Sequence, residues 1–333
     1  MKAVQITGYG DLKNNVTLTE TERPTPQAHQ VLIETRAASI NPVDYKIVNG
    51  AMKSVLKLDL PTGLGYDVSG KVIEKGSSVN HLEVGDDVYS RVPTNHPGTL
   101  AEYVAVDSDV VVKKPSNLTY EESSSLPLVG MTTIQVFNEA NLKPGDRVLI
   151  HAGSGGVGTF AIQYAKDKGA YVYTTTSTKN VDWVKSLGAD RVIDYKKEDY
   201  KTIATDLDVV YDTLGDNYTL EAFDQIKSGG KVITIAGVPD DELAKRLGLN
   251  WFIRKILAFQ RRKITKKAKE KNAKYSMVLM QPDSHQLIEI TALSEKGDLK
   301  PVIDRVYSLS DAVEALQYQK DGHAKGKVVV KVK

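Results

Sequence analysis

The 333-residue sequence contains no cysteine, so disulfide bonds and thiolate metal sites are excluded. It also has no apolar run near the roughly 20 residues of a membrane-spanning helix. Residues 1–6 lack the long apolar core of a secretion signal, and we therefore expect a cytoplasmic protein. The six histidines are scattered without metal-ligand spacing, so we expect no bound metal.

The chain has little net charge, +2 in total, which implies no charged partner. This average hides an asymmetry, because residues 245–274 hold 12 Lys and Arg against one acid, a net +11 that leaves −9 for the remainder. Apolar residues, among them Phe252, Ile256 and Phe259, recur there at helical spacing. Such a segment is either a helix packed on the protein with a solvated outer face or a peripheral contact with anionic lipid. Its few aromatics and the absence of a recognisable module argue against nucleic-acid binding.

A glycine-rich turn joins a strand-like run to a helix-like run. The apolar run 148–151 leads into Gly153, Ser154, Gly155, Gly156, Val157 and Gly158, and an amphipathic segment follows over 159–168. In this context Gly153 allows a tight turn, Gly155 lets a pyrophosphate approach the backbone, and Gly158 lets the helix pack on the strand. The helix N-terminus would offer amide donors to the phosphates. The alternative is a glycine turn without a ligand.

Strand-like and helical runs alternate from about residue 124, which predicts a parallel sheet with crossover helices. The expected strands are 148–151, 171–176, 191–195, 208–212, 231–236 and 275–280. Ligands of such sheets bind beyond the carboxyl ends of the strands. We therefore expect the glycine turn, Leu214 with Gly215, and Ala236 with Gly237 and Val238 to lie together at a dinucleotide.

Residues 1 to about 120 instead read as short strands punctuated by Gly, Pro and Asp, which favours a compact barrel. The tail after residue 282 is too short for a core of its own, so we expect it to return to this N-terminal part. The predicted domains are 1–123 with 283–333, and 124–282, a doubly wound Rossmann-type α/β domain. Within the first, Asn41, Pro42 and Asp44 have the signature of a helix start.

The expected second strand of the sheet ends without the acid that usually binds the ribose hydroxyls of NAD. Thr176, Ser177 and Lys179 stand there instead, and Tyr195 follows the third strand, where it could flank an adenosine. Hydroxyls and an ammonium suit a 2′-phosphate, so we favour NADPH as the cofactor. The alternative is an ordinary hydroxyl-rich strand end with an exposed lysine.

With these pieces placed, the whole sequence resembles the zinc-independent medium-chain dehydrogenase/reductases, above all quinone oxidoreductases related to zeta-crystallin and plant enone and alkenal reductases. The resemblance implies a Rossmann domain and a GroES-like barrel as the catalytic domain. It is carried by residues 38–46, 65–70, 84–88, 152–158 and 322–327. The zinc-bearing branch of this family has a cysteine at the place of Asn41, and Gly-His-Glu where this chain reads Gly65-Tyr66-Asp67. Zinc ligands are thus lacking.

The resemblance implies hydride transfer from NADPH to a quinone or to the C=C bond of an α,β-unsaturated carbonyl, in an enzyme that forms a homodimer. It places Lys46 near the nicotinamide, as a stabiliser of the substrate oxyanion and a proton donor. Asn41 would orient cofactor or substrate, and Tyr45 and Tyr66 would line the pocket. Thr132 would contact the nicotinamide side and Lys325 a phosphate or ribose.

Several of these residues also have a simpler structural interpretation. Capping alone explains Asn41 and Asp44, and Lys46 is equally well a solvated lysine; Asp44 either holds Lys46 or only improves the helix start. A rival function from another class is a non-catalytic NADPH-binding protein that docks on membranes through residues 245–274.

Overall fold

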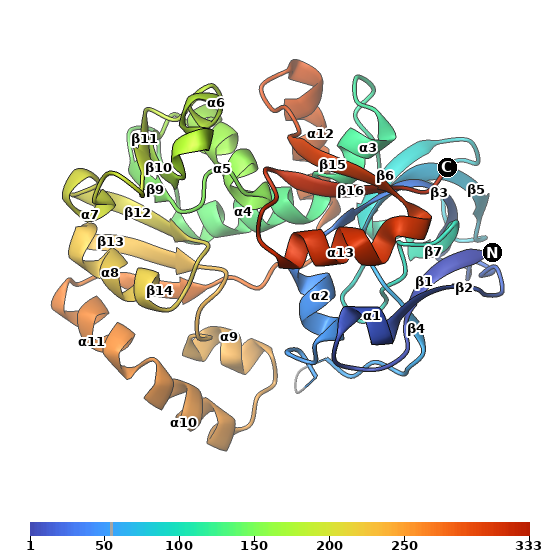
Figure 1. The fold of residues 1–333 in the computed structure, drawn as a ribbon, viewed down its shortest axis with the longest axis horizontal. Helices are drawn as coiled ribbons and strands as arrows, with labels where there is room; N and C mark the ends of the chain where they lie inside the picture. Colours follow the sequence, from blue (N-terminus) through green and yellow to red (C-terminus); the bar gives the residue numbers. More distant parts are fainter. Residues whose placement is uncertain (54–55) are drawn as a thin grey trace. The chain divides into compact units, whose positions relative to one another are not determined.

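The computed structural model describes residues 1–53 and 56–333, which form two compact units (Figure 1). The first comprises Met1–Met131 and Gln281–Lys333, and the second comprises Thr132–Met280. Among the described residues, no helix is both long and apolar enough to cross a membrane.

A six-stranded parallel sheet forms the centre of the second unit. Its strands are β9 (Arg147–Ile150), β10 (Tyr171–Thr176), β11 (Arg191–Asp194), β12 (Leu207–Asp212), β13 (Ile226–Thr234) and β14 (Lys274–Met277). Their order across the sheet is β11-β10-β9-β12-β13-β14, so the direction of winding reverses between β9 and β12. This is the doubly wound order of dinucleotide-binding folds, and it confirms the predicted fold class. Because helices cover both faces, strand β9 reads as an unbroken apolar run, with Val148, Leu149 and Ile150 buried.

The helices of the second unit follow its strands. They are the end of α4 (Pro127–Ala140), α5 (Gly156–Asp167), α6 (Val181–Lys185), α7 (Tyr200–Ile203), α8 (Asn217–Gln225), α9 (Asp241–Arg246), α10 (Trp251–Gln260) and α11 (Arg262–Glu270). Helix α5 packs on β9 and β10, α8 on β12 and β13, and α11 on α8 and β14. Leu149, Phe223 and Ile264 belong to the core that results.

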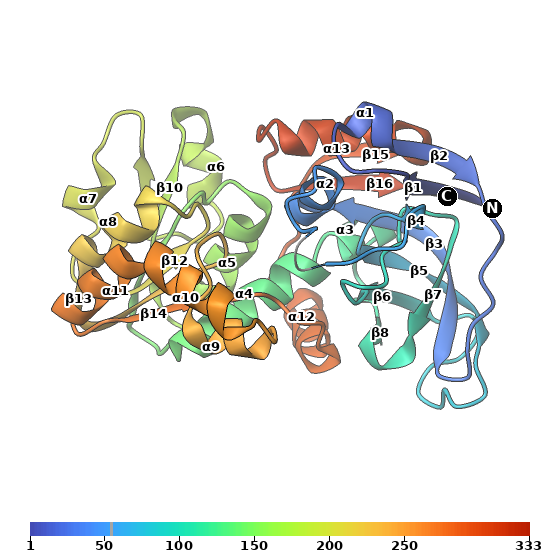
Figure 2. The same ribbon diagram turned by 90° about the horizontal axis from the view of Figure 1, so that it is seen from below.

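Two antiparallel-rich sheets build the first unit (Figures 1 and 2). The smaller sheet has the order β2-β1-β4, from β1 (Lys2–Ile6), β2 (Val16–Glu20) and β4 (Thr62–Gly63). The larger has the order β15-β16-β3-β5-β6-β8, with β7 paired to β3. Its strands are β3 (Gln30–Ile40), β5 (Asp67–Lys75), β6 (Asp87–Arg91), β7 (Tyr103–Asp107), β8 (Val111–Lys113), β15 (Ile303–Ser308) and β16 (Lys327–Lys331).

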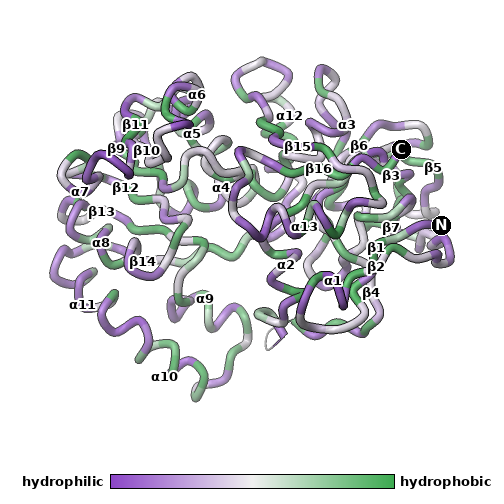
Figure 3. Tube along the Cα trace, in the orientation of Figure 1, coloured by the Kyte–Doolittle hydropathy of each residue, from purple (hydrophilic) through white to green (hydrophobic). Residues whose placement is uncertain are grey.

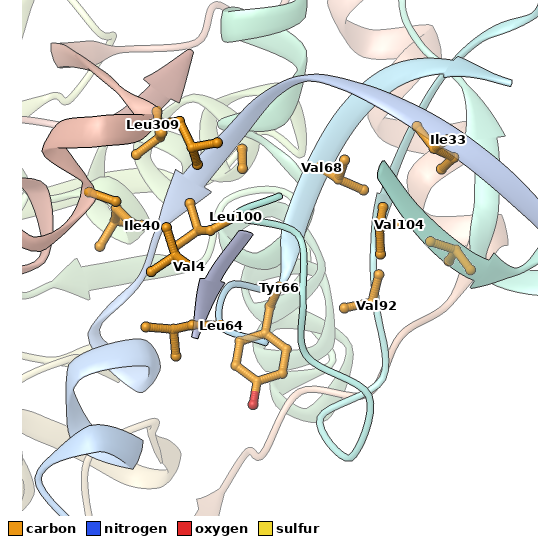
Figure 4. Packing of buried hydrophobic residues seen from close by; sticks show 14 of the residues in the cluster. Val4, Ile33, Ile40, Leu64, Tyr66, Val68, Val92, Leu100, Val104 and Leu309 are labelled. Carbon is orange, nitrogen blue, oxygen red and sulfur yellow. The ribbon is translucent and has the colours of Figure 1, made fainter. Parts of the chain in front are cut away.

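The tail after residue 281 is part of this unit, in which β16 pairs antiparallel with β3, Val328 opposite Ile40. The helices are α1 (Leu12–Asn15), α2 (Pro42–Val48), α3 (Tyr120–Ser124), the start of α4, α12 (Ser284–Lys296) and α13 (Ala312–Lys320). One large apolar core fills the unit, and Figure 4 shows Ile33, Val68 and Val104 among its residues.

One helix break lies elsewhere than the sequence predicts. The sequence, in which apolar residues recur at helical spacing, predicts helices over 120–128 and 131–140 that are interrupted near Pro127 and Gly130. The structure instead ends α3 at Ser124 and starts α4 at Pro127, with Gly130 inside α4. Proline lacks only an N–H that the first turn of a helix leaves unbonded in any case, so Pro127 starts a helix rather than ending one.

Candidate functional site

The predicted glycine turn connects β9 to α5 in the second unit, with Gly155 as the N-cap of the helix. A Cβ atom at Gly158 would lie 2.3 Å from the Ala152 carbonyl oxygen, and one at Gly153 would lie 2.2 Å from Thr174 Oγ1. Both glycines are thus required by the fold itself. A Cβ at Gly155 would meet only the Ala152 oxygen, at 3.4 Å. The backbone there is open on its outer side, where a ligand can approach.

Hydrogen bonds fix this turn on the sheet. The Gly153 N–H donates to the Thr175 carbonyl oxygen at 2.9 Å, and the Ala152 N–H donates to Thr175 Oγ1 at 3.2 Å. Ala152 has a φ of 54°, a left-handed conformation that few non-glycine residues adopt. The turn is therefore held in one shape by β10 before any ligand binds.

The structure brings the other two predicted turns to the same end of the sheet. Thr213 Oγ1 donates to the His151 carbonyl oxygen at 2.9 Å, which ties the turn after β12 to the turn after β9. The carboxylate of Asp212 accepts the N–H groups of Leu214 and Gly215, both at 2.9 Å. Gly215 has a φ of 79°, and a Cβ there would lie 2.1 Å from the Ala236 oxygen. The turns containing Leu214 and Ala236 thus touch, and Gly237 and Val238 follow directly.

The end of β10 carries the hydroxyl groups that the sequence predicts, and it is followed by a lysine that forms no ion pair among the described residues. Thr176 Oγ1 is buried and makes no hydrogen bond within the described chain. Lys179 is exposed and likewise forms no ion pair there, while Ser177 is half-buried. The Tyr195 N–H donates to the Thr176 oxygen at 3.1 Å, which brings the exposed Tyr195 ring beside this strand end.

Sequence reasoning missed two groups at this edge. Asp194 lies opposite Thr176 in the register of β10 and β11. Hydrogen bonds from the Thr178 side chain and the Lys196 N–H, with nearby lysines, hold the pKa of Asp194 below its usual range against the opposing effect of burial. The ring of His151 is buried without a hydrogen bond within the described chain, and burial lowers its pKa to about 4. His151 is thus a neutral packing residue at neutral pH.

In the first unit, α2 begins as the sequence predicts, with Asn41 as N-cap and Pro42 as the first helical residue. The carboxylate of Asp44 accepts the Asn41 N–H at 2.6 Å. Of the two roles left open for Asp44, the hydrogen bond therefore supports the one at the helix start. Lys46 lies in the last turn of α2, exposed and without an ion pair among the residues described.

The side chain of Asn41 enters a buried polar network with Ser39, Asp67 and Lys327, here named the Asn41 network. Asn41 Nδ2 and Ser39 Oγ both donate to Asp67 Oδ2 at 2.9 Å, and the Leu128 N–H donates to Asp67 Oδ1 at 3.1 Å. The Lys327 ammonium donates to Asn41 Oδ1 and lies 3.5 Å from Asp67 Oδ2. Each of these side chains is buried, so the network is isolated from water.

Two further charges surround the Asn41 network. Burial raises the pKa of Asp44 to about 7, against the opposing effect of the Asn41 N–H, and its Oδ1 has no partner among the described residues. The buried Arg91 donates to the Val92 carbonyl oxygen and to Thr94 Oγ1, both at 2.8 Å. Burial lowers the pKa of Lys327 and of Arg91, although Asp67 opposes both shifts. Two carboxyls thus share a water-free region with two cations.

The remaining predicted residues differ in exposure. Tyr66 is completely buried, its hydroxyl donates to the Thr94 oxygen at 3.1 Å, and its ring lies in the core shown in Figure 4. Tyr45 is half-buried against the same core, and burial raises its pKa. Thr132 is buried on α4 in the second unit. Lys325 is half-exposed and forms no ion pair within the described residues.

Sequence reasoning named Lys325 but gave no role to Lys327, Asp67 or Arg91. The available signals were a lysine directly before the apolar run of residues 328–330 and an aspartate at the start of strand β5. Charged residues are almost never fully buried unless they are paired. Spacing alone could not show that Lys327 meets Asn41, because 286 positions separate them.

Models of two protein families match the chain. One is the alcohol dehydrogenase GroES-like domain, over residues 27–116, and the other is a zinc-binding dehydrogenase domain, over residues 187–330. A 2-methylene-furan-3-one reductase of Solanum lycopersicum is 34% identical over 345 residues, which cover 99% of this chain and 79% of the relative. A chloroplastic NADPH-dependent alkenal/one oxidoreductase of Arabidopsis thaliana is 32% identical with the same coverage. The solved quinone oxidoreductase of Coxiella burnetii superposes with a TM-score of 0.86 at 36% identity, covering 100% of this chain and 99% of that one.

The zinc that the second family name implies does not fit the residues present. The oxygens of Asn41 and Asp67 already hold the Lys327 ammonium, a cation in its own right. Among the described residues, no three His, Cys, Asp or Glu side chains gather as a ligand set. Zinc sites need such a set in a closed geometry. We therefore derive no chemistry through a metal.

Proposed function

The chain belongs to the medium-chain dehydrogenase/reductase superfamily, among its quinone and enone oxidoreductases, and on this premise we propose that it is an NADPH-dependent reductase of quinones or of α,β-unsaturated carbonyls. When bound, NADPH would supply a hydride, and the Lys46 ammonium, which regains its proton from water, would supply the proton that completes the reduction. A quinone then becomes a hydroquinone, or the C=C bond of an enone becomes saturated. The homodimer expected from the resemblance stays a prediction.

The observation that carries the proposal is the glycine turn at the switch point of the second unit. The turn leads into the N-terminus of α5, where unpaired N–H groups and the helix dipole favour a pyrophosphate. The open backbone at Gly155 leaves room for its close approach. Turns at Gly215 and Gly237 would then hold the nicotinamide half of the molecule.

NADPH is favoured over NADH by the end of β10. The unbonded hydroxyl of Thr176, the half-buried Ser177 and the free ammonium of Lys179 can donate hydrogen bonds to a 2′-phosphate. Asp194 opposes this preference by its charge, yet its carboxylate already accepts hydrogen bonds from Lys196 and Thr178. At the end of β10, the hydrogen-bond donors therefore outnumber the acceptors that have no donor of their own.

The cofactor assignment is tested by titration of the purified chain with NADPH and NADH. We expect NADPH to bind more tightly, and Lys179→Glu to weaken NADPH binding while leaving NADH binding nearly unchanged, because only NADPH carries the 2′-phosphate. Lys185→Glu, an exposed lysine on α6, is the matched control. Equal affinity of the wild-type chain for both nucleotides would refute the preference.

In the first unit, we assign to Lys46 the stabilisation of the oxyanion that grows on the substrate carbonyl. Its ammonium is exposed and free of any ion pair among the described residues, so a substrate oxygen meets no competing carboxylate. Asn41 is locked by its bonds to Asp67 and Lys327, which suits a group that orients a ligand. Tyr45 is half-buried and accessible, whereas Tyr66, fully buried, would support the pocket from behind.

Activity is tested by following NADPH absorbance with a panel of quinones, enones and enals. We expect turnover with at least one class, and a lower kcat in Lys46→Met with NADPH affinity unchanged. Lys13→Met, an exposed lysine on α1, is the control for loss of a surface charge. NADPH binding without turnover on any acceptor would favour the non-catalytic alternative and contradict the proposal.

A further inference from the structure

Helix α10 of the second unit presents its apolar side chains to solvent. It has no buried residue, and the exposed fractions are 71% for Trp251, 60% for Phe252 and 65% for Phe259. Ile253 and Ile256 are exposed as well. The chain has five Phe in all, and the three outside α10 are buried. Phenylalanine side chains, which are buried elsewhere in the protein, are thus exposed on α10.

The orientation of α10 explains this exposure. Arg254 turns toward α9 and pairs with Asp241 at 3.0 Å, and Leu257 is the other partly covered side chain on the helix. Phe252, Ile256 and Phe259 follow one another at steps of four and three residues, so they share the opposite face. A helix packed only for stability would turn that face inward. Figures 1 and 2 show α10 on the outer side of the unit, beside α9 and α11.

Cations border this apolar face, here named the α10 face. The guanidinium of Arg262 lies over the face of the Phe259 ring, 4.0 Å from its centre, so a positive charge adjoins the apolar face. Lys255, between the aromatic residues, and Lys263 and Lys269 on α11 are exposed without an ion pair among the described residues. In Figure 3, α11 is largely hydrophilic while α10 carries hydrophobic turns. The two helices together form an apolar strip with a basic margin.

The charge identifies what covers the α10 face. A second copy of this chain in a symmetric dimer would meet the same patch, and a segment of net +11 would then face itself. Like charges brought together in an interface strongly disfavour such a contact. The partner must instead be apolar at its centre and anionic at its rim. A bilayer with acidic headgroups has both properties, because Trp and Phe enter the interface while Lys and Arg contact the headgroups.

We propose that the α10 face docks the protein peripherally on membranes that contain anionic lipid. Helix α10 inserts Trp251, Phe252 and Phe259 at the headgroup boundary, and Lys255, Arg262 and Lys263 bind the acidic headgroups. The folded protein need not rearrange, because these side chains are already exposed. This assigns the basic segment 245–274 a role of its own, independent of the oxidoreductase activity.

Flotation of the full-length protein with vesicles tests the proposal. We expect binding to phosphatidylcholine vesicles that contain phosphatidylglycerol at low salt, and little binding to phosphatidylcholine alone or at high salt. Phe252→Ser with Phe259→Ser, and separately Lys255→Glu with Lys263→Glu, should each lower partitioning by roughly tenfold or more. The matched controls are Ile288→Ser with Val306→Ser, which are exposed apolar residues elsewhere, and Lys13→Glu with Lys320→Glu.

The chain has two tryptophans, and Trp183→Phe leaves Trp251 as the only one. Its emission should shift to the blue on vesicle binding and be quenched by lipids brominated near the headgroup. Absence of flotation at low salt, or flotation that neither pair of variants weakens, would overturn the proposal. A wild-type dimer that Phe252→Ser with Phe259→Ser converts to a monomer would assign the face to a second copy and overturn it equally.

Discussion

At the scale of the residue, the buried carboxyl of Asp44 makes stability depend on pH. Its pKa in the folded chain is about 7, against 3.8 for the free side chain, because burial disfavours the charged form. Between these values the folded state binds more protons than the unfolded state, so stability falls as the pH rises through this window. The loss is largely complete above pH 7, where the buried carboxyl is charged.

We predict that Asp44→Asn removes this dependence. The asparagine oxygen still accepts the Asn41 N–H, but no charge is buried at high pH. The stability of the variant relative to wild type should rise by about 1.4 kcal/mol per pH unit across the window. Urea unfolding at pH 5 and pH 8 measures this, with the exposed Asp109→Asn as control. An identical difference at both pH values would mean that Asp44 is charged throughout.

A second prediction concerns Lys327. Lys327→Met leaves the carboxylate of Asp67 buried with only neutral donors, and loss of one partner of a buried ion pair costs about 3–5 kcal/mol. Adding Asp67→Asn to this variant should restore part of the stability, because the uncompensated charge is gone. Lys331→Met, on the same strand but exposed and 3.3 Å from Glu121, should cost less than about 1 kcal/mol. Equal losses from Lys327 and Lys331 would contradict the pairing.

Single residues were predictable where the reason was local. Asn41, Pro42 and Asp44 predict the start of α2 because capping acts within four positions. The partners of Asn41 were not predictable, because Asp67 and Lys327 approach it only through the pairing of β3 with β5 and β16. A single sequence contains no signal for such long-range pairs.

At the scale of the element, substitutions in the glycine turn can distinguish a glycine that the packing of the turn requires from one that ligand binding requires. We predict that Gly158→Ala lowers thermal stability and abolishes nucleotide binding, because its Cβ would collide with the Ala152 oxygen. Gly155→Ala should keep wild-type stability, since its Cβ meets the nearest atom at 3.4 Å. It should nevertheless weaken NADPH binding by about tenfold or more, because the methyl group would lie in the path proposed for the pyrophosphate.

Thermal melts and NADPH fluorescence titration measure these two effects separately. Gly145→Ala, at a turn with free space around its Cβ but a φ of 84°, is a control for backbone strain remote from the turn. Wild-type NADPH affinity in Gly155→Ala would place the nucleotide elsewhere.

Helices and strands with a regular spacing of apolar residues were predictable from the sequence, whereas the positions at which a helix breaks were not. The six strands of the second unit lie within a few residues of the predicted runs at most of their ends, because most of these parallel strands are runs of apolar and β-branched residues. The sequence also predicts a helix over about 284–296, and α12 has these bounds, with Asp283 as the cap. The basic segment, by contrast, divides at Arg261 into α10 and α11, and of these two helices only α11 has buried residues. Its apolar spacing continues across that break, so periodicity could not locate it.

At the scale of the whole molecule, the second unit is one continuous segment with its own core and sheet. We predict that residues 132–280, expressed alone, unfold cooperatively, because all six strands and all of their helices except the start of α4 lie within the segment. Residues 1–131 alone should not, since they lack β15 and β16. Circular dichroism during thermal denaturation measures both. Cooperative unfolding of 1–131 would show that β16 is dispensable for the first core.

The pairing of β16 with β3 has a consequence for synthesis. The ribosome produces residues 132–280 before the strand that completes the older, N-terminal unit, so the middle of the chain can finish folding first. Until β16 emerges, Ala37–Ile40 of β3 lack the neighbour they hydrogen-bond in the finished protein. A nascent chain paused within residues 281–326 would therefore display an unpaired strand backbone although the sheet of the second unit is already complete, a state open to chaperones and to aggregation alike.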